Sequence, residues 1–325
     1  RLYTTFNQYL CVFNPFHLIK NYFSESRTYI EQFKKNLGEI TGKKYIIPVN
    51  QARVGLYLTM KYYLSRSNKK EVLLSPYTIA EVVSMVVCAG GRPIFCDIDR
   101  KTCNIALENI KNKINDKTGL VLVTHFYGKI CDVTDIKKVV PKNIPIIEDC
   151  AQSFTGKIKN KFSGTMGSAG VYSFGLYKNI NAFYGGAIVT DDKKLNDYIQ
   201  KEVYSWTEVS FSFFYKKVIN GLMVDSVTSK LSYGLFFFYF FRWAFKKNIE
   251  SINNKLKIDV NPTLIKKLPE AYKVRLKNKQ AYLIVQQLES CFVDTKKRII
   301  NAKMWNKYLS PIKKHIILPE FNDDF

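Results

Sequence analysis

Residues 144–190 constrain the fold more than any other part of the chain. They begin with a short apolar run, Ile144 to Ile147, which ends at the acidic pair Glu148-Asp149. Such a run is typical of a buried parallel strand, and open α/β sheets bind ligands at the carboxyl ends of these strands. Further strands are expected from Gly170 to Phe174 and from Ala187 to Thr190. The stretch therefore predicts part of an α/β sheet with a carboxylate at its binding edge.

The residues between the last two strands suggest a chemistry for that edge. A lone lysine, Lys178, follows the second strand, and a Gly-Gly turn, Gly185-Gly186, precedes the third. A lysine amine can bond to an aldehyde, and an aspartate such as Asp149 can hold a proton on a pyridine nitrogen. This combination suits a pyridoxal 5′-phosphate site. Taken singly, each residue also has an ordinary interpretation, as a surface lysine or a helix cap.

Upstream of this stretch, short apolar strands alternate with helices. Such alternation predicts βαβ units and a mostly parallel sheet. The loop that opens the helix after Gln51 presents free backbone N–H groups, which form a natural phosphate site, and Arg53 could add charge there. The expected strands are Tyr45–Val49, Val72–Ser75, Pro93–Cys96 and Leu120–Thr124. The expected helices run from about Glu25 to Leu37, from just after Gln51 to about Leu64, from Ile79 to Ala89, from about Ala106 to Ile114 and from Val133 to Val140.

The composition limits the partners and the compartment. With 50 Lys and Arg against 27 Asp and Glu, the 325-residue chain has a net charge of +23. A basic surface bias, an anionic membrane, phosphorylated substrates or nucleic acid could explain this charge, but no nucleic-acid-binding motif accompanies it, so nucleic acid is not an expected partner. The 7 cysteines are odd in number and form no CxxC pair, which favours reduced thiols in a cytoplasmic protein and no metal site. Because the chain starts at Arg1 and stops abruptly at Phe325, we expect a fragment.

Residues 205–262 break the alternation. Residues 231–241 are uncharged and largely aromatic, but this run is too short to cross a bilayer, which takes about 20 apolar residues. Lysines bracket the segment, and two interpretations stay open: an interface between subunits or a buried helical pair, which we favour, and a membrane-surface contact through residues 213–247. Farther on, Tyr272–Leu288 and Lys296–Leu309 predict two amphipathic helices. The expected domains are 1–204 (large, cofactor-binding), 205–262 (insertion or interface) and 263–325 (start of a truncated smaller domain).

An ordered set of motifs resembles the DegT/DnrJ/EryC1/StrS family of sugar aminotransferases. The resemblance covers about residues 45–199 and 272–309. It implies a fold-type-I transferase dependent on pyridoxal phosphate, with a mostly parallel seven-stranded sheet, flanking helices and a smaller C-terminal domain. The motifs that carry it are Ile147-Glu148-Asp149-Cys150-Ala151-Gln152-Ser153, Gly167 to Phe174, Lys178-Asn179, Gly185-Gly186, Ala89 to Asp99, and His125-Phe126-Tyr127-Gly128.

The resemblance also implies roles for individual residues. Lys178 would be the catalytic residue and would bind the cofactor covalently, and Asp149 would pair with the pyridinium nitrogen. The remaining cofactor contacts are each implied by one matching position: Gln152 to the 3-oxygen of the ring, Ser173 to the phosphate, the backbone amides of Ala52 and Arg53 to the phosphate, and Lys273 to the phosphate of a second subunit.

The chain departs from the family pattern in several places. Near Ile79 the family usually has an aromatic residue that stacks on the cofactor, so Tyr77 is expected to stack instead. Phe183-Tyr184 replaces a Gly-Glu pair in front of Gly185-Gly186, and Lys273 replaces an asparagine. Some family members have a histidine in place of the lysine and catalyse dehydration. Because residue 178 is lysine, transamination is expected, and His125 is assigned a packing role or a place beside the cofactor.

These observations predict an aminotransferase that moves an amino group, from a donor such as glutamate, onto a keto group of a nucleotide-linked sugar for cell-surface polysaccharide or amino-sugar biosynthesis. A homodimer in the cytoplasm is expected, with association to a membrane as an open alternative. Two other functions remain open: a sugar dehydratase or isomerase that uses the same cofactor, and a non-catalytic, membrane-associated homologue.

Overall fold

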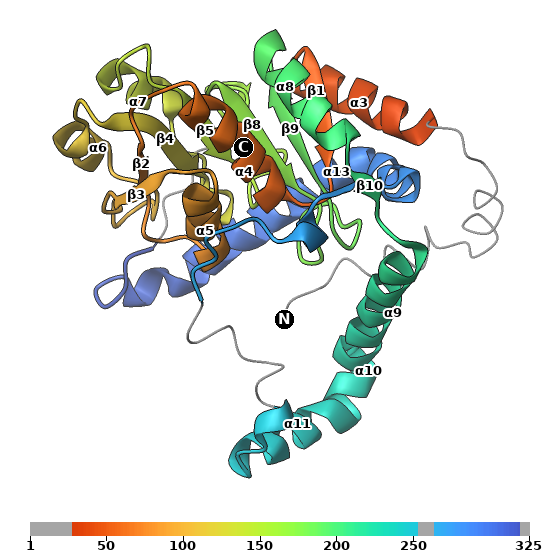
Figure 1. Ribbon diagram of the computed structural model, residues 1–325. Helices are drawn as coiled ribbons and strands as arrows, with labels where there is room; N and C mark the ends of the chain where they lie inside the picture. The colour runs from red at the N-terminus through yellow and green to blue at the C-terminus, as the bar shows by residue number, and fades with distance from the viewer. Residues whose placement is uncertain (1–27, 253–262, 319–325) are drawn as a thin grey trace.

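The structure, a computed structural model, describes residues 28–252 and 263–318. Its centre is a seven-stranded sheet with the order β1-β9-β8-β5-β4-β2-β3 (Figure 1). The five strands from β8 to β3 pair in parallel, whereas β9 is antiparallel to both of its neighbours, β8 and β1. The strands are β1 (Tyr45–Val49), β2 (Glu71–Leu74), β3 (Arg92–Phe95), β4 (Thr118–Thr124), β5 (Ile146–Asp149), β8 (Ala169–Ser173) and β9 (Gly186–Thr190). The expectation of a mostly parallel seven-stranded sheet in an α/β fold is confirmed.

Helices cover both faces of the sheet because its strands are apolar on both sides. In β4, Leu120 and Leu122 pack with one set of helices, whereas Val121 and Val123 pack with the other. The first face carries α4 (Ala52–Ser65), α5 (Ala80–Cys88) and α8 (Lys193–Tyr204). The opposite face carries α6 (Leu107–Lys113), α7 (Val133–Val139), α3 (Thr28–Thr41) and α13 (Asn278–Leu309).

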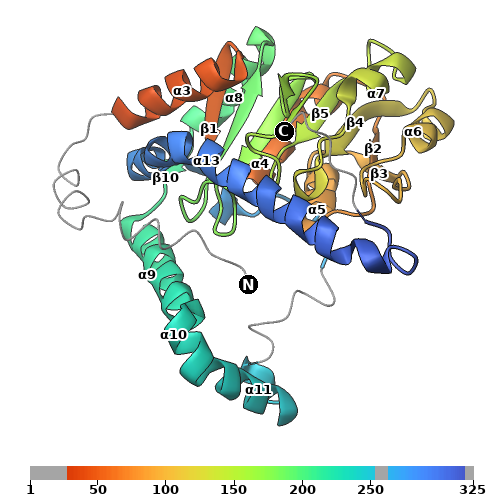
Figure 2. The ribbon, with the colours of Figure 1, turned by 180° about the vertical axis from the view of Figure 1, so that it is seen from behind.

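The C-terminal part of the chain differs from the sequence expectation. The two helices expected at Tyr272–Leu288 and Lys296–Leu309 are one continuous helix, α13, which lies beside α3 (Figure 2). The sequence from residue 289 to 295 contains neither glycine nor proline, so nothing interrupts the helical hydrogen bonds. Buried residues of α13 end at Cys291, and the later turns are largely exposed.

The aromatic segment also forms helices. They are α9 (Phe211–Thr228), α10 (Lys230–Ser232), a π-helical turn (Tyr233–Phe237) and α11 (Phe238–Lys246). Figures 1 and 2 show that these helices follow one another away from the sheet. Of the two forms of the favoured expectation, a helical pair buried within one chain is therefore wrong, whereas an interface between subunits stays a prediction. In residues 28–252 and 263–318, no helix combines the length and the apolar content that are needed to cross a membrane.

Candidate active site

The sheet brings the candidate residues to one edge. Asp149 ends β5 and is paired with Thr124 at the end of β4. Ser173 ends β8 and is paired with Gly186, the first residue of β9. Gly186 is also paired with Val49 at the end of β1, three residues before α4 begins. Because β9 is antiparallel to its neighbours, its first residue lies at the same edge as their carboxyl ends.

Asp149 is a buried carboxylate with a raised proton affinity. Its side chain is 5% exposed, and the backbone N–H of Ala151 donates to its Oδ1 at 3.0 Å. Burial raises the pKa of the carboxyl, whereas this hydrogen bond and the charge of Lys178 act in the opposite direction. A buried carboxylate with few donors can accept a further charged or N–H donor.

Lys178 lies within electrostatic reach of Asp149. Burial lowers the pKa of its ammonium group, and the charge of Arg53 lowers it further, whereas Asp149 opposes both effects. A lowered pKa increases the fraction of neutral amine, which is the form that can attack a carbonyl or accept a proton. The structure thus places the carboxylate and the amine of one candidate reaction centre together.

The backbone of β9 approaches the start of α4 closely at Gly186. A Cβ atom built on Gly186 would lie 2.8 Å from the backbone N of Ala52 and 2.8 Å from the carbonyl O of Tyr172. The residue before α4, Gln51, provides no side-chain cap. Since the first N–H groups of a helix lack partners within the helix, they can bind an anion at this point.

The side chain of Arg53, in the first turn of α4, makes contacts with two other side chains. Its Nη1 lies 3.4 Å from Glu81 Oε1 and 3.4 Å from the hydroxyl of Tyr272, and its guanidinium carbon lies 5.7 Å from the centre of the Tyr272 ring. These contacts hold the charge of Arg53 near Lys178 without consuming its backbone N–H.

Asn50 is a residue that the sequence reasoning missed. Its side chain is 1% exposed, yet neither Oδ1 nor Nδ2 has a hydrogen-bond partner among the described residues. It lies between β1 and α4, directly before the proposed anion site. A buried amide without partners is costly, so Asn50 is a candidate to contact a bound group. No sequence signal other than its place after a strand could have singled it out.

Gln152 and Tyr77 line a cavity of about 520 Å³ beside these residues. The Oε1 atom of Gln152 accepts a hydrogen bond of 2.8 Å from the backbone N–H of Tyr127, which leaves the amide N–H groups of the side chain as donors. The Tyr77 ring lies 4.4 Å from that of Phe126 and is 49% exposed. Asn179, which directly follows Lys178, also lines the cavity.

Three cationic side chains line the same cavity. Lys101, Lys129 and Arg298 line it, and none of the described residues around it is acidic. Arg298 comes from α13 and contacts the side chain of Asn179. A cavity of this size with three cations suits an organic ligand that carries phosphate.

Lys273 does not lie with the other candidate site residues of the same chain. Its Nζ lies 2.6 Å from Glu270 Oε1, and this hydrogen bond raises the pKa of Lys273. It does not line the cavity described above. Its assignment to a phosphate of a second subunit stays a prediction.

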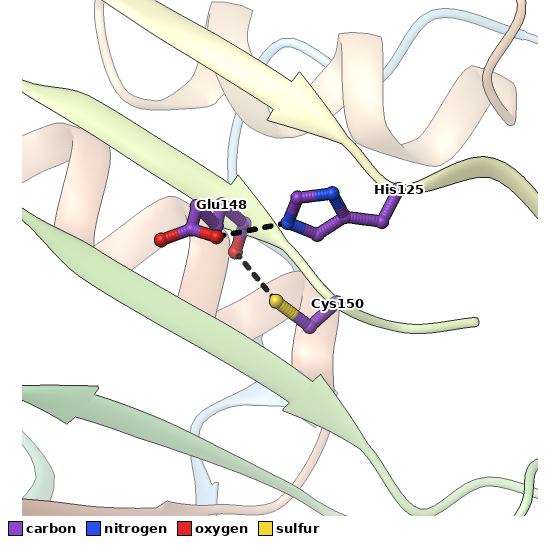
Figure 3. Close-up of side chains that lie close together, drawn as sticks. All are labelled: His125, Glu148 and Cys150. Carbon is purple, nitrogen blue, oxygen red and sulfur yellow. Dashed lines mark hydrogen bonds and ion pairs between the residues drawn. The ribbon is translucent and has the colours of Figure 1, made fainter. Parts of the chain in front are cut away.

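His125, Glu148 and Cys150 form a buried cluster next to Asp149 in the chain, at the carboxyl ends of β4 and β5 (Figure 3). Glu148 Oε2 lies 2.9 Å from His125 Nε2 and accepts from Gly164 N at 2.7 Å, and Oε1 accepts from the backbone N–H groups of Met166 and Gly167. The Nδ1 atom of His125 accepts from the backbone N–H of Cys131 at 3.0 Å, so the ring proton is on Nε2 and is donated to Glu148.

This cluster has the residue types of a metal site but acts as a hydrogen-bond network. Four donors already occupy the Glu148 carboxylate, and the Cys150 Sγ atom lies 3.7 Å from the carbonyl O of Glu148. The network holds the ends of β4 and β5 in register and so positions Asp149. The buried hydrogen bonds of His125 agree with the packing role that was one of its two expectations, and a place beside the cofactor stays a prediction. The structural role of Glu148 was missed, although this residue directly precedes Asp149.

Comparison with known proteins gives a consistent picture. A model of the DegT/DnrJ/EryC1/StrS aminotransferase family matches residues 17–220. GDP-perosamine synthase of Escherichia coli O157:H7 is 33% identical over 181 residues, which are 55% of this chain and 50% of that protein. Spore coat polysaccharide biosynthesis protein SpsC of Bacillus subtilis (strain 168) is 30% identical over 172 residues, 53% of this chain and 44% of that protein. The chain thus spans about half the length of these curated relatives.

Solved structures support the fold. An aminotransferase from Psychrobacter cryohalolentis superimposes with a TM-score of 0.66 at 23% identity, covering 91% of this chain and 66% of that one. The Helicobacter pylori aminotransferase PseC, involved in the biosynthesis of pseudoaminic acid, gives a TM-score of 0.63 at 20% identity, covering 87% of this chain and 63% of that one. At these identities the likeness shows the fold alone.

Proposed function

The chain belongs to the DegT/DnrJ/EryC1/StrS aminotransferase family, and from this we propose that it works as a pyridoxal-phosphate-dependent aminotransferase on a nucleotide-linked keto sugar. The observation that carries the proposal is that the buried Asp149 carboxylate lies close enough to Lys178 for each charge to shift the pKa of the other group, while burial lowers the pKa of Lys178. The amino donor is proposed to be an amino acid such as glutamate.

The residues at the sheet edge fit pyridoxal phosphate. Gly186 and its paired residue Ser173 lie against the start of α4, and the buried Asn50 amide directly before α4 has no hydrogen-bond partner among the described residues, which suits contact with a bound group. The Ala52 and Arg53 amides would bind that phosphate. Asp149 would accept a hydrogen bond from the ring nitrogen, Gln152 would donate to the ring oxygen, and Tyr77 would pack beside the ring.

When bound, pyridoxal phosphate supplies a reactive aldehyde and a ring that withdraws electrons. Asp149, as a buried carboxylate, would keep the ring nitrogen protonated, which makes that withdrawal stronger. The neutral Lys178 amine would accept the proton that leaves the donor carbon and would hold it for return to the carbon on the other side of the amino nitrogen. The lowered pKa of Lys178 suits this role because the neutral amine must be available near neutral pH.

The substrate proposal is supported by the cationic cavity. Lys101, Lys129 and Arg298 would neutralise the phosphates of a nucleotide sugar, and the exposed Tyr127 ring, next to Phe126, could stack on its base. The similar proteins point the same way, since they include a GDP-perosamine synthase and DesI, whose structure was solved in the presence of its TDP-sugar product.

Three further parts of the proposal concern assembly and location. We infer a homodimer in which Lys273 serves the site of the other subunit, a cytoplasmic location, and contact with a membrane through residues 213–247. The six cysteines in the described part of the chain are free, which suits a reducing compartment. We retain a large domain, 1–204, an inserted segment, 205–262, and the start of a smaller domain, 263–325, as the proposed organisation.

Replacing Lys178 tests the cofactor assignment. Lys178→Ala should abolish turnover and remove the absorbance of the covalently bound cofactor, whereas Lys142→Ala, at an exposed lysine, should change neither. Unchanged cofactor absorbance in Lys178→Ala would refute the assignment. Analysis of products from glutamate and a nucleotide keto sugar then separates transamination, which yields an amino sugar, from dehydration, which does not.

A further inference from the structure

We propose that residues 211–246, here called the arm, dock on an anionic lipid surface. The arm comprises α9, α10, the π-helical turn and α11, and it extends from the body of the protein (Figures 1 and 2). Its root is fixed: Phe214 and Val218 are 1% and 5% exposed and belong to the core that contains α3 and α13. From Ile219 onward, which is 54% exposed, most of the large apolar side chains face solvent.

The far half of the arm is apolar on nearly all sides. Exposed side chains there include Leu231 (73%), Leu235 (58%), Phe236 (69%), Tyr239 (62%), Trp243 (50%) and Phe245 (69%). A helix that is apolar all round is normally buried, and a large exposed apolar surface marks a contact with a membrane or another protein. Something must therefore cover this part of the arm.

The positive charges of the arm favour an anionic lipid surface as the partner that covers its apolar side chains. Lys216 and Lys217 are exposed near the root, and Arg242, Lys246 and Lys247 are exposed at the far end. Two arms packed on each other would bring these cations together, whereas anionic headgroups would neutralise them. Aromatic rings beside lysine and arginine are typical of helices that lie at the headgroup level.

The arm would lie on the bilayer and would not cross it. Among the helices of residues 28–252 and 263–318, none is long and apolar enough to span. Docking would insert the aromatic rings at the boundary between headgroups and acyl chains and would leave the lysines at the phosphates. The body of the protein would then be held close to the lipid surface through the root of α9.

Vesicle flotation with the full chain tests the proposal. The chain should float with phosphatidylcholine vesicles that contain phosphatidylglycerol, and much less with phosphatidylcholine alone, and raised salt should release it. In a Trp305→Phe background, which removes the exposed tryptophan of α13, the Trp243 emission should shift to shorter wavelength on binding. Flotation that does not depend on phosphatidylglycerol, or no flotation at all, would overturn the proposal.

Matched variants assign the binding to the arm. Lys246→Gln with Lys247→Gln should weaken partitioning roughly 30-fold, from about 1 kcal/mol for each lysine near the surface, whereas Lys266→Gln with Lys267→Gln changes the same charge elsewhere and should act far less. Likewise Phe236→Ser with Phe240→Ser should abolish flotation.

The control for the apolar pair is Ile300→Ser with Met304→Ser, which removes exposed apolar side chains from α13 and should leave flotation intact. Equal effects of arm and control variants would refute the assignment. So would a vesicle-free dimer, seen by sedimentation, that the arm variants dissociate, because a second copy would then be the cover. The inference rests on the membrane contact proposed above for residues 213–247, but none of these readouts depends on catalytic activity, so the aminotransferase assignment can fail without affecting this test.

Discussion

Replacing Phe214 should loosen the loop that follows Lys178, the proposed catalytic residue. Phe214 is 1% exposed, and its ring centre lies 6.4 Å from that of Phe183, 6.4 Å from that of Tyr184 and 5.4 Å from that of Tyr215. A buried Phe→Ala change costs about 3–5 kcal/mol. We expect Phe214→Ala to lower the free energy of unfolding by an amount in that range, part of which comes from the lost ring pairs, worth about 0.5–1.5 kcal/mol each.

The assay is urea unfolding followed by fluorescence, together with titration of the protein with pyridoxal phosphate. Because Phe183 lies five residues after Lys178, a loosened loop should also weaken cofactor binding. The control is Phe236→Ala at a ring that is 69% exposed, which should change the free energy of unfolding by less than about 0.5 kcal/mol. If Phe214→Ala changes the free energy of unfolding and cofactor binding no more than this control does, the root of the arm does not support the loop.

Three further predictions concern the sheet edge. Gly186→Ala should cost about 1–3 kcal/mol of stability, measured by urea unfolding, because its Cβ would lie 2.8 Å from two backbone atoms, whereas Gly234→Ala has nothing within 4 Å of its Cβ and should be nearly neutral. For Lys178, whose native pKa is lowered from 10.5, the rate of covalent cofactor attachment should rise with pH through that lowered pKa. Arg53→Gln should move this profile to higher pH by removing a cation, and an unmoved profile would contradict the assigned cause. Glu148→Gln should lower the free energy of unfolding by about 3 kcal/mol in the same assay, because an amide N–H₂ would face backbone donors. An unchanged free energy of unfolding would refute the hydrogen-bond network around Glu148.

The pH effect of Lys178 on stability has a definite sign. Its pKa in the folded protein lies below the value of 10.5 in the unfolded chain, so the unfolded chain binds more protons between these two values. The contribution of Lys178 to the free energy of unfolding should therefore rise with pH across that window. Below the folded pKa the amine is charged in both states and its burial is a constant cost.

Local patterns in the sequence predicted the sheet because each strand is a short apolar run that a helix follows. The strand expected at Ile144–Ile147 is found at Ile146–Asp149, a shift of two residues, and Asp149 still ends at the expected edge. Lys178 was found in the same way, as a lone lysine after a strand. These features depend on neighbours within a few residues, which periodicity records.

Contacts between distant residues could not be read in this way. Glu148 binds backbone N–H groups 16 to 19 residues downstream, and only the folded loop brings them to it. The continuity of α13 was missed for a different reason: its apolar face ends at Cys291, so the later turns appeared as a separate amphipathic helix. The helical hydrogen bonds continue regardless of which face is buried.

The two clearest departures from the family pattern form one structural unit. Phe183-Tyr184 replaces Gly-Glu in the loop after Lys178, and the aromatic arm follows about 30 residues later; the rings of Tyr184 and Phe213 lie 5.5 Å apart. The large rings of the loop need apolar partners, and the root of α9 provides them. The part of the arm that supports the loop and the part that is proposed to dock on lipid meet inside α9, between the buried Val218 and the exposed Ile219. Changes beyond this boundary should therefore affect docking alone, whereas changes before it should also affect the proposed cofactor site.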